Sequence, residues 1–508
     1  MMSEYKLTRY PLFINGALTH PTHEQYIEVI NPANGKVIAE VANGCEVDVD
    51  KAVAAARTCF DQGDWPNTTP DERSKVLYKI ANLIIANAHE LAALEVACSG
   101  GTISRIKGLD IPAVADLFMK LAEEIKTFQF VENLPLTPLP EPLHSQVRKE
   151  PIGVCGLITA WNFPLLLLAM KVAPALAAGN TVVVKPATTT PTSTLRFIEI
   201  ISTVLPDGVV NVVTGPGQRI GEALCEHQDV DKISFTGSTR VGIAVQQMAA
   251  KTLKRVTLEL GGKGAAIVMP DADLERTAYG ALFGVYLNSG QACESGTRLL
   301  VHESIHDELV DQLIALSNDM VIGDPMDPGV AMGPMTTAAH CQSVLDYIES
   351  AREQGATIAC GGERVEVAGC EEGFYIQPTI ITNVTNNMKV AQEEIFGPVL
   401  SIIKFSTTEQ AIEIANDNIY GLSAGIWSED VVQAQGIAQK LRAGSIWIND
   451  WHMMRTDGAF GGYKQSGYGR EFGKYSLTSY LETKTITTSF EHDKEKKTFH
   501  KFVHKTLA

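Results

Sequence analysis

The sequence predicts an α/β protein built on a parallel sheet that helices cover on both faces. Short runs rich in β-branched residues alternate along the chain with longer helical patterns. A chain of 508 residues exceeds what one hydrophobic core usually serves, so more than one domain is expected. The strands of the sheet are expected at residues 152–158, 181–185, 210–213 and 232–235.

Helical patterns precede this sheet, and a second α/β series follows it. Three long helical patterns are expected to pack on the sheet, at residues 46–62, 70–99 and 106–131. No strand is predicted before residue 152. The proline-rich segment 134–142 cannot continue a helix and predicts an extended arm. A second series of strands and helices runs from Glu259 to about Asn449.

Composition and charge argue against several classes of protein. Hydrophobic residues make up 45% of the chain, but no apolar run reaches the length of a membrane span. The net charge of −17 disfavours a nucleic-acid partner, because phosphates require clustered Lys and Arg. Nine cysteines without a Cys-x-x-Cys pair predict free thiols and no metal cage. The first residues resemble neither a secretory signal nor a transit peptide, so a cytoplasmic location is expected.

Two glycine-containing turns are candidates for binding phosphate. Residues 215–221, with Gly217 and Gly221, follow a predicted strand and open a helix, although their spacing departs from G-x-G-x-x-G and an ordinary loop fits equally well. In residues 235–242, Gly237 and Ser238 again stand between a strand and a helix, where the hydroxyl can bind a ligand or cap the helix. Two such turns in one parallel sheet favour a dinucleotide.

A single cysteine, Cys293, stands on a glycine-flanked turn between a helical pattern and a strand, where a chain can present a nucleophile. Glu259 supplies a carboxylate between two leucines. Each residue also has an ordinary structural interpretation: a lone cysteine often fills a core, and a glutamate in a strand often faces solvent. Asn162 before Phe-Pro suits a turn, and Lys185 before Pro suits a strand end.

Several further motifs occur together and in one order along the chain. They are Leu12-Phe13-Ile14-Asn15-Gly16, Ala160-Trp161-Asn162-Phe163-Pro164-Leu165, Lys185-Pro186-Ala187, the segment 258–263, the segment around Cys293, residues 393–399 (EEIFGPV) and residues 461–467 (GGYKQSG). In this combination the chain resembles the NAD(P)-dependent aldehyde dehydrogenase superfamily over roughly residues 10–486. The joint set outweighs the ordinary interpretation of each residue.

The resemblance implies a catalytic role for three residues. Cys293 corresponds to the nucleophile that attacks the aldehyde, forming a thiohemiacetal and then a thioester. Asn162 corresponds to the amide that stabilises the oxyanion together with the Cys293 N–H. Glu259 corresponds to the general base of thioester hydrolysis, and its apolar neighbours predict a raised pKa.

The resemblance also implies a cofactor site for NAD or NADP. Lys185 is expected at the adenosine ribose, Gly237 and Ser238 at the pyrophosphate, and Glu394 with Phe396 at the nicotinamide ribose and ring. The remaining candidates for this site are Trp161, Gly217, Gly221 and Leu260. NAD-preferring members often carry Glu where this chain has Thr188, and Thr does not repel a 2′-phosphate. NADP is therefore expected to be tolerated and used, with NAD still possible.

The aldehyde is expected in a mostly apolar tunnel, which favours an apolar or aromatic substrate. Its candidates are Phe163, Leu167, Met170, Leu287, Trp451, His452, Met453 and Phe460. Glu294 is a further candidate, although a side chain that points away from the site is slightly favoured. Arg455 raises the alternative of a semialdehyde or glyceraldehyde-phosphate dehydrogenase, but a solvent-facing Arg455 is favoured. A non-catalytic binding or structural protein with this fold is the alternative from another class.

The resemblance further implies three parts and a homodimer or homotetramer. Residues 1–133 with 151–260 are expected to bind the cofactor, residues 261–449 to form the catalytic domain, and residues 134–150 with 470–508 to form an oligomerisation arm and tail. The strand at 481–489 is expected to build the arm with the proline-rich segment. The basic tail places His500 and His504 at a spacing that can hold a metal, but no third ligand is evident and no metal is predicted.

Overall fold

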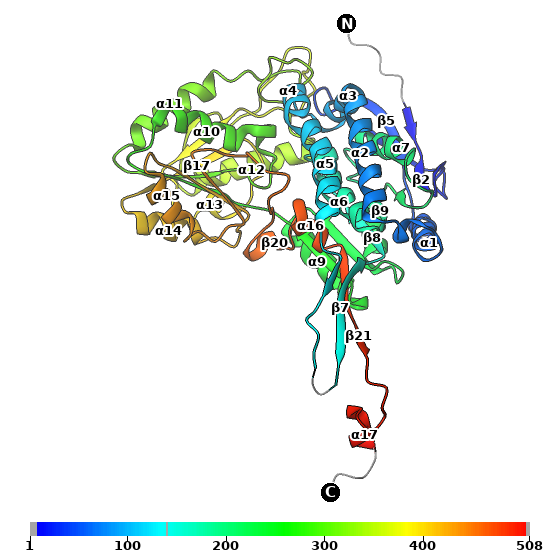
Figure 1. Ribbon diagram of the computed structural model, residues 1–508. Coiled ribbons are helices and arrows are strands. Elements are labelled where there is room, and N and C mark those ends of the chain that lie inside the picture. Colours follow the sequence, from blue (N-terminus) through cyan, green and yellow to red (C-terminus); the bar gives the residue numbers. More distant parts are fainter. Residues whose placement is uncertain (1–7, 139–140, 504–508) are drawn as a thin grey trace.

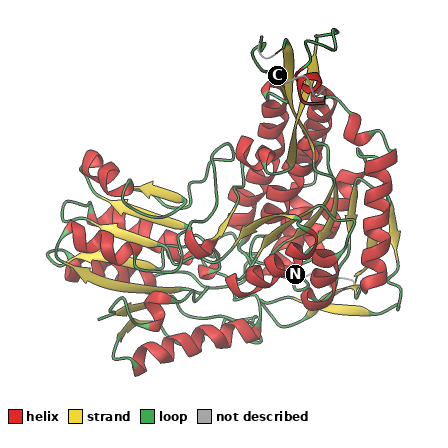
Figure 2. Cartoon of the chain, turned by 90° about the horizontal axis from the view of Figure 1, so that it is seen from below, coloured by secondary structure: helices red, strands yellow, loops and turns green. Residues whose placement is uncertain are grey.

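The computed structural model describes residues 8–138 and 141–503, apart from the side chain of Lys501. Two large sheets lie in two adjacent lobes, and a narrow β arm projects from their junction (Figure 1). The helices flank the strands in both lobes (Figure 2). All nine cysteines are free thiols, as the sequence predicts. The predicted α/β class is confirmed.

The first sheet has eight strands, and its five central strands are parallel. In spatial order the strands are β20 (Gly467–Tyr468), β12 (Arg255–Glu259), β11 (Lys232–Thr236), β8 (Val154–Ile158), β9 (Thr181–Lys185), β10 (Val210–Val212), β2 (Leu12–Ile14) and β3 (Ala17–Thr19). Strands β8 to β11 are buried throughout, as expected for a parallel sheet with helices on both faces. β20 joins the sheet antiparallel to β12, which brings a late segment of the chain beside Glu259.

The prediction that no strand precedes residue 152 is wrong. β2 and β3 form one edge of the first sheet, and three further strands, β1 (Thr8–Tyr10), β5 (Val37–Ala42) and β4 (Tyr26–Ile30), form a small separate sheet. Four of these five strands have five residues or fewer, which leaves little length for an alternating pattern. The strand expected at 152–158 begins at Val154, after Gly153, whose φ of 138° interrupts it.

The helices of this lobe follow the predicted patterns with two breaks. They are α1 (Glu46–Gln62), α2 (Pro70–Ala86), α3 (Ala88–Ser99), α4 (Ile103–Arg105), α5 (Ile111–Thr127), α6 (Pro164–Ala178), α7 (Thr192–Ser202), α8 (Glu222–Glu226) and α9 (Thr239–Ala249). The single helix expected at 70–99 is two helices, because Asn87 folds its side chain back onto the Leu83 carbonyl and ends α2. The pattern at 106–131 contains a π turn before α5, and its last residue starts a strand.

The second sheet has seven strands, all parallel except at the β15 edge. In spatial order they are β15 (Thr357–Cys360), β16 (Thr379–Thr382), β17 (Val399–Phe405), β14 (Arg298–His302), β13 (Ala265–Val268), β18 (Ser423–Trp427) and β19 (Ser445–Ile448). Its helices are α10 (Leu274–Tyr286), α11 (His306–Asn318), α12 (Ala338–Glu353), α13 (Lys389–Gln392), α14 (Thr408–Asn416) and α15 (Val431–Ala438). The second α/β series expected after Glu259 is therefore confirmed.

The arm is a three-stranded antiparallel sheet. Its strands are β21 (Leu481–Ser489), β7 (Leu143–Pro151) and β6 (Val131–Asn133), in that order. The sequence suggested that the proline-rich segment pairs with β21, but β21 pairs with β7. The described part of the proline-rich segment links β6 to β7, and a single bridge joins Thr137 to Leu143. α16 (Gly473–Thr478) precedes β21, and the tail helix α17 (Thr498–Val503) lies beyond the end of the arm (Figure 1). His504 lies outside the described residues.

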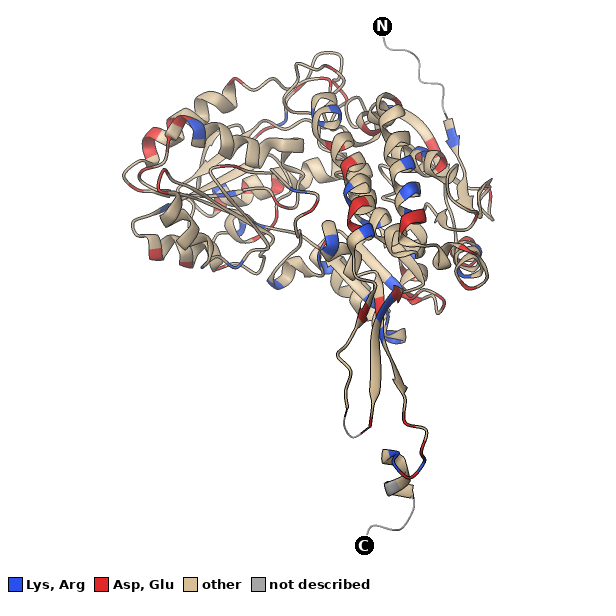
Figure 3. Ribbon diagram, in the orientation of Figure 1, with Lys and Arg blue, Asp and Glu red and all other residues tan. Residues whose placement is uncertain are grey.

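Acidic and basic residues are interspersed on the helices over the first sheet (Figure 3). On α5, Lys120 lies 3.8 Å from Glu123, and at the base of the arm Arg255 pairs with Glu482 at 2.7 Å. Neighbouring surface charges therefore pair with one another. Among the described residues no single helix is long and apolar enough to cross a bilayer; α2 and α3 pass the length and composition test only when taken together, and they are bent by 69°.

Two helical glycines allow the packing of the second lobe to be tested. A Cβ at Gly280 on α10 would collide with the Trp427 ring of β18, whereas one at Gly436 on α15 would meet open space. We expect Gly280→Ala to lower the free energy of unfolding by about 1–3 kcal/mol through overpacking. Gly436→Ala, the matched control, should raise it by about 0.5–1 kcal/mol through helix propensity. Denaturant unfolding measures both; a stabilising change at Gly280 would contradict this account.

Candidate active site

Cys293 lies on a loop whose backbone is held in an unusual conformation. After α10, Asn288, Ser289 and Gly290 all have positive φ, at 53°, 56° and 74°. A Cβ on Gly290 would collide with the Gly397 carbonyl, so only glycine allows these two backbone segments to meet. Positive φ in successive non-glycine residues is strained and persists where the surroundings enforce it. The loop then enters β14.

Two cavities meet at Cys293. The larger has a volume of about 1040 Å³ and is mostly apolar. Its lining residues are Gly108, Leu109, Asp110, Ala113, Phe163, Leu166, Leu167, Met170, Phe283, Leu287, Cys293, Glu294, His452, Met453, Met454, Thr456, Phe460 and Phe472. We call this the apolar cavity. Most of the residues that the sequence assigned to the aldehyde tunnel line it.

The second cavity has a volume of about 660 Å³ and contains the carboxylates of Glu259 and Glu394. Its lining residues are Ala160, Trp161, Asn162, Thr236, Gly237, Ser238, Glu259, Leu260, Gly261, Cys293, His340, Glu394 and Phe396. We call this the polar cavity. Among the residues that line the two cavities, Cys293 is the one that both share. A group bound in either cavity therefore faces the same sulfur.

Glu259 ends β12 and is buried with 4% of its surface exposed. Neither carboxylate oxygen has a hydrogen-bond partner among the described residues. Burial, assisted by the nearby charge of Glu471, raises the pKa of Glu259 well above its usual value, as its apolar neighbours predict. Such a carboxylate exchanges a proton more readily near neutral pH than an exposed one does.

A buried ion pair lies close to Glu259. Lys171 on α6 and Glu471 are both almost fully buried, and their charged atoms are 2.8 Å apart. Lys171 also donates to the Ser234 hydroxyl of β11 at 3.1 Å. Removing either partner would leave an uncompensated charge in the interior, which is strongly destabilising. The pair therefore connects α6, β11 and the C-terminal segment behind the site.

Asn162 directs its side chain at the loop that carries Cys293. Its amide donates to the Gln291 carbonyl at 2.9 Å, and the Asn288 amide donates back to the Asn162 carbonyl at 2.9 Å. These two hydrogen bonds fasten the segment before α6 to the loop that carries Cys293. The Asn162 amide thus bonds a residue two positions before Cys293, and Asn162 lines the polar cavity.

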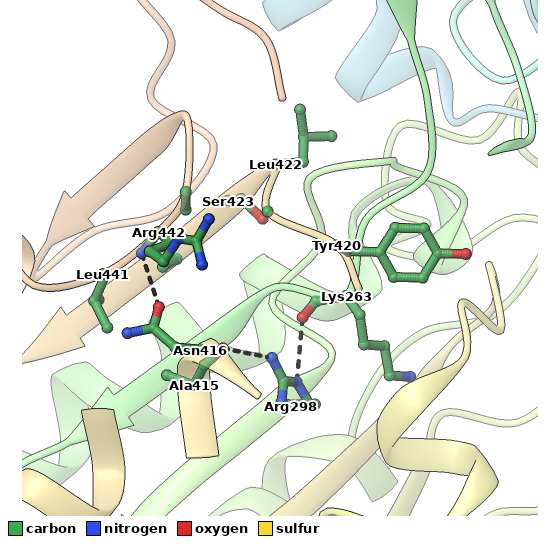
Figure 4. A pocket seen from close by; sticks show the side chains of 12 residues that line it. Lys263, Arg298, Ala415, Asn416, Tyr420, Leu422, Ser423, Leu441 and Arg442 are labelled. Carbon is green, nitrogen blue, oxygen red and sulfur yellow. Dashed lines mark hydrogen bonds between the residues drawn. The ribbon is translucent and has the colours of Figure 1, made fainter. Parts of the chain in front are cut away.

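Glu394 lies against a turn made of two glycines. It accepts a hydrogen bond from the Gly262 N–H at 3.0 Å, and a Cβ on Gly261 would collide with its carboxylate. Burial raises the pKa of Glu394 to about 7. Behind this turn Arg298 donates to the carbonyls of Lys263 and Ala415, which ties β14 to the segment after β12 and to α14 (Figure 4).

The structure separates the phosphate-binding candidates into two groups. Gly237 and Ser238 line the polar cavity, and the Ser238 hydroxyl caps α9 by accepting from the Val241 N–H at 3.4 Å. Gly217 and Gly221 do not line that cavity, and side chains at either position would meet open space. The turn with Gly217 and Gly221 therefore lies outside the cavity that Cys293 lines.

Lys185 is the last residue of β9 and Thr188 follows the strand, and neither lines the polar cavity. Lys185 is 5% exposed and donates to the Pro186 carbonyl at 2.9 Å. Burial lowers its pKa to about 8. The Thr188 hydroxyl donates to the Gly215 carbonyl at 2.7 Å, which joins this segment to the first phosphate-binding candidate.

The Glu294 side chain points toward the Cys293 sulfur, which corrects the slight preference for the opposite orientation. It accepts a hydrogen bond from the Cys293 thiol at 3.2 Å and lies 2.9 Å from His452. Residue spacing alone could not give this direction, because a turn sets it. Burial, followed by the charge of Glu294, raises the pKa of Cys293 well above its usual value.

Trp451 was expected to line the tunnel, but it lies behind the cavity wall. It is 1% exposed, and its indole N–H donates to the Glu294 carbonyl at 3.0 Å. Arg455 lies 80% exposed and pairs with Asp457 at 2.9 Å, so the solvent-facing orientation is confirmed. Trp451 thus supports the loop that carries Cys293, and Arg455 does not line the apolar cavity.

Several residues of the site were not predicted. His340 lies edge-on to the rings of Trp161 and Phe396, and its Nε2 donates to the Phe396 carbonyl at 2.7 Å. Phe283 and Asp110 line the apolar cavity. All three come from helical patterns that read as ordinary amphipathic segments, so no motif marked them.

Known sequences and structures resemble this chain over nearly its whole length. The profile described as "Aldehyde dehydrogenase family" matches residues 19–486. The chain is 41% identical over 478 residues to a betaine aldehyde dehydrogenase of Bacillus subtilis (strain 168), covering 94% of this chain and 96% of the relative. It is 41% identical to a mitochondrial benzaldehyde dehydrogenase of Antirrhinum majus, covering 95% and 89%. A solved betaine aldehyde dehydrogenase from Staphylococcus aureus in complex with NAD⁺ superposes with a TM-score of 0.93 at 37% identity, covering 95% of each chain.

The raised pKa of Glu259 predicts a pH-dependent stability effect. A carboxyl whose pKa is higher in the folded state stabilises the fold below its unfolded pKa and loses this contribution as pH rises through its folded pKa. Each unit of the shift corresponds to about 1.4 kcal/mol. We therefore expect Glu259→Gln to raise the thermal unfolding midpoint near pH 8 and to lose this advantage toward pH 5.

The control is Glu482→Gln on the arm. Its hydrogen bond from Arg255 lowers the pKa of Glu482, so the linkage has the opposite sign. Because both side chains are about half exposed, the effect should stay below about 1 kcal/mol. A parallel pH dependence of Glu259→Gln and the wild-type protein in thermal scans would refute the predicted shift.

Proposed function

The chain belongs to the aldehyde dehydrogenase family, and on this premise we propose that it oxidises an apolar or aromatic aldehyde to the carboxylic acid through a covalent intermediate on Cys293. The observation that carries the proposal is that one thiol is shared by an apolar cavity and a polar cavity. The reaction requires this arrangement, because the carbon bonded to sulfur must face the aldehyde's binding site on one side and a hydride acceptor on the other.

We assign the polar cavity to the nicotinamide end of NAD or NADP. When bound, the cofactor accepts the hydride from the substrate carbon. Gly237 and Ser238 open α9, where backbone N–H groups and the helix dipole favour a phosphate. Glu394, Phe396, Trp161 and Leu260 surround the remaining space, and the solved Staphylococcus aureus relative contains NAD⁺. The buried ammonium of Lys185 and the Thr188 hydroxyl suit the ribose end, and Gly217 with Gly221 remain candidates for a phosphate contact.

In the proposed first half-reaction, the Cys293 sulfur bonds to the aldehyde carbon and the carbonyl oxygen becomes an oxyanion. The Asn162 amide is a donor on the cavity wall beside this sulfur, and a preorganised donor stabilises the negative oxygen. Loss of hydride from the same carbon restores a carbonyl and leaves a thioester. A thiolate suits this step because it is both a good nucleophile and a good leaving group.

In the proposed second half-reaction, water hydrolyses the thioester. Glu259 accepts a proton from that water as it adds to the carbonyl carbon. Its burial and raised pKa make the carboxylate a stronger base than an exposed glutamate. Expulsion of the Cys293 sulfur then releases the carboxylic acid. A chain that transferred the acyl group to coenzyme A would not need this base.

The lining of the apolar cavity supports an uncharged substrate. Among the described side chains that line it there is neither Lys nor Arg to pair with a carboxylate or phosphate. Its carboxylates, Glu294 and Asp110, have partners in His452 and Arg105. A semialdehyde or glyceraldehyde phosphate would therefore bring an unpaired anion toward two carboxylates.

A cationic aldehyde is the second candidate. The phenyl rings of Phe163, Phe283 and Phe460 line the same cavity as the two carboxylates, and such rings attract quaternary ammonium groups. The Bacillus subtilis relative is named a betaine aldehyde dehydrogenase. This candidate ranks second because both carboxylates already have positively charged or hydrogen-bonding partners.

We also propose that the first sheet lobe binds the cofactor, that the second supplies the catalytic loop, and that the arm joins copies of the chain into a dimer or tetramer. β21 is an edge strand of nine residues whose side chains, including Ile486, are mostly exposed. The exposed Phe490 follows directly after the strand. An exposed edge of this length is a template for pairing with another chain. Light scattering of the full chain and of a variant shortened after residue 480 tests this assignment.

The covalent mechanism and the substrate class are tested together. We expect Cys293→Ala to reduce NAD(P)H formation by about 10³-fold or more, since the nucleophile is lost. In the wild-type enzyme, kcat/KM for benzaldehyde should exceed that for succinate semialdehyde by at least about 10-fold. A higher value for betaine aldehyde would favour the cationic candidate. Retained turnover in Cys293→Ala would sink the mechanism, and a preference for succinate semialdehyde would sink the apolar assignment.

Cofactor choice is tested at Thr188. A carboxylate at this position would repel the 2′-phosphate of NADP, so Thr188→Glu should lower kcat/KM with NADP by at least about 10-fold while NAD is much less affected. Thr188→Gln is the control, because it has the same size without the charge. If Glu and Gln change the NADP rate equally, sterics and not charge account for the effect.

A further inference from the structure

Three buried side chains form a hydrogen-bonded chain at the wall of the apolar cavity. The Cys293 Sγ lies 3.2 Å from Glu294 Oε2, and Glu294 Oε1 lies 2.9 Å from His452 Nδ1. The side chains of Glu294 and His452 are 4% and 3% exposed. A nucleophile, a base in contact with it and a third group that orients the base are the recurring elements of activated nucleophiles.

Both ring nitrogens of His452 face acceptors. Nδ1 faces the Glu294 carboxylate, and Nε2 lies 3.2 Å from the Gly284 carbonyl of α10. A carbonyl only accepts, so Nε2 donates to it. With Nε2 bonded in this way, Nδ1 donates to the carboxylate when Glu294 is ionised and accepts from it when Glu294 is protonated. The ring is also held edge-on against Phe283 at a centroid distance of 5.3 Å.

The backbone of Glu294 is fixed from below. Its carbonyl accepts from the Ser423 hydroxyl at 2.8 Å and from the Trp451 indole at 3.0 Å. These two hydrogen bonds set the direction in which the side chain leaves the loop. The contact between Glu294 and the Cys293 sulfur is therefore fixed by the loop together with Ser423 of β18 and Trp451, which follows β19.

We propose that Glu294 is a second catalytic carboxylate, which takes the proton of the Cys293 thiol as sulfur adds to the aldehyde and returns it when the thioester is hydrolysed. This role rests on the proposed aldehyde oxidation. His452 is a positioning residue, which orients the acceptor oxygen of Glu294. Glu259 keeps its separate role toward water.

The proton and electron balance closes. In the first step the S–H bond breaks, its electron pair forms the S–C bond, Glu294 becomes neutral and the aldehyde oxygen becomes an oxyanion. Hydride leaves the carbon, which is oxidised to a thioester as the nicotinamide of the established cofactor class is reduced. Water then adds with its proton going to Glu259, the C–S bond breaks, and the departing sulfur recovers its proton from Glu294. Glu259 finally releases its proton to solvent.

The charges around Cys293 and Glu294 explain why the thiol proton is transferred as the S–C bond forms. Burial and the Glu294 charge raise the pKa of Cys293, whereas the contacts of Glu294 with His452, with its own backbone and with the Cys293 thiol together outweigh burial and lower the pKa of Glu294. The thiol is thus protonated at rest, and its proton leaves as the S–C bond forms. Glu394 and Glu259 also raise the Cys293 pKa, and Asp110, next to Arg105, faces Glu294 from the other wall.

Glu259 is poorly placed for this proton in the resting structure. Its two oxygens have no hydrogen-bond partner among the described residues, whereas Glu294 already contacts the sulfur. General base catalysis requires hydrogen-bond reach to the proton that is removed. The contact therefore favours Glu294 for the thiol.

Alkylation of Cys293 by iodoacetamide tests this role without aldehyde or cofactor. The reagent is neutral, and mass spectrometry of the Cys293 peptide separates this thiol from the other eight. If Glu294 removes the thiol proton, Glu294→Gln should slow alkylation near pH 7.5 by about 10-fold or more. If Glu294 only repels the thiolate, the same variant should accelerate alkylation. An unchanged or faster rate overturns the proposal.

Further variants separate the role from structural damage. Glu393→Gln removes a carboxylate that bonds Tyr347 and does not contact the sulfur, so its alkylation rate should equal that of the wild type. Glu294→Asp keeps the charge but shortens the side chain and so withdraws the carboxylate from the sulfur. If Glu294→Gln does not fold, slow alkylation in Glu294→Asp supports the same role for Glu294, and an unchanged or faster rate overturns it. His452→Phe should slow alkylation and His452→Gln, which can still donate to Glu294, should restore part of it. Because no turnover is involved, failure of aldehyde oxidation and failure of this proposal are distinguishable.

Discussion

The close contact between Gly290 and Gly397 fixes where the sulfur lies, and the rest of the site depends on it. Because Gly290 carries no Cβ to collide with the Gly397 carbonyl, the loop after α10 approaches the segment before β17 and turns through three residues of positive φ. This turn delivers Cys293 to the space between the two large sheets. Glu259 reaches the same space from the end of β12 in the other sheet, so the constellation exists only when both lobes are docked.

The site concentrates buried ionisable groups that a core devoted to stability would avoid. Glu259 and Glu394 are buried carboxylates with raised pKa values, and Lys171 with Glu471 forms an ion pair behind them. Each such group costs desolvation free energy that its partners only partly return. The remaining interior, with parallel strands buried on both faces, supplies the hydrophobic stabilisation that tolerates this cost. Perturbed ionisable groups clustered in one cleft are typical of sites built for proton transfer.

Much of the fold was predictable, because long periodic segments carry their own signal. The strand at 181–185 and the helix at 46–62 occur with the predicted bounds. The short N-terminal strands were missed because three residues show no period, and one predicted helix divides where Asn87 bonds its own turn. In the site, motifs located Cys293 and Glu259 but not His340 or the direction of Glu294. Those depend on packing between distant segments, which local sequence does not encode.

The environments of Glu259 and Glu294 differ in a way that assigns them different proton-transfer tasks. Both carboxylates are buried, but Glu259 has no hydrogen-bond partner among the described residues, whereas Glu294 contacts a thiol and an imidazole. Burial therefore raises the pKa of Glu259, while His452 holds the pKa of Glu294 low. Carboxyl groups whose surroundings move their pKa values apart can serve as acid and base in one reaction. In the proposed mechanism Glu259 serves the polar cavity, where water attacks, and Glu294 serves the apolar cavity, where sulfur meets the aldehyde, so that each half-reaction has its own carboxylate.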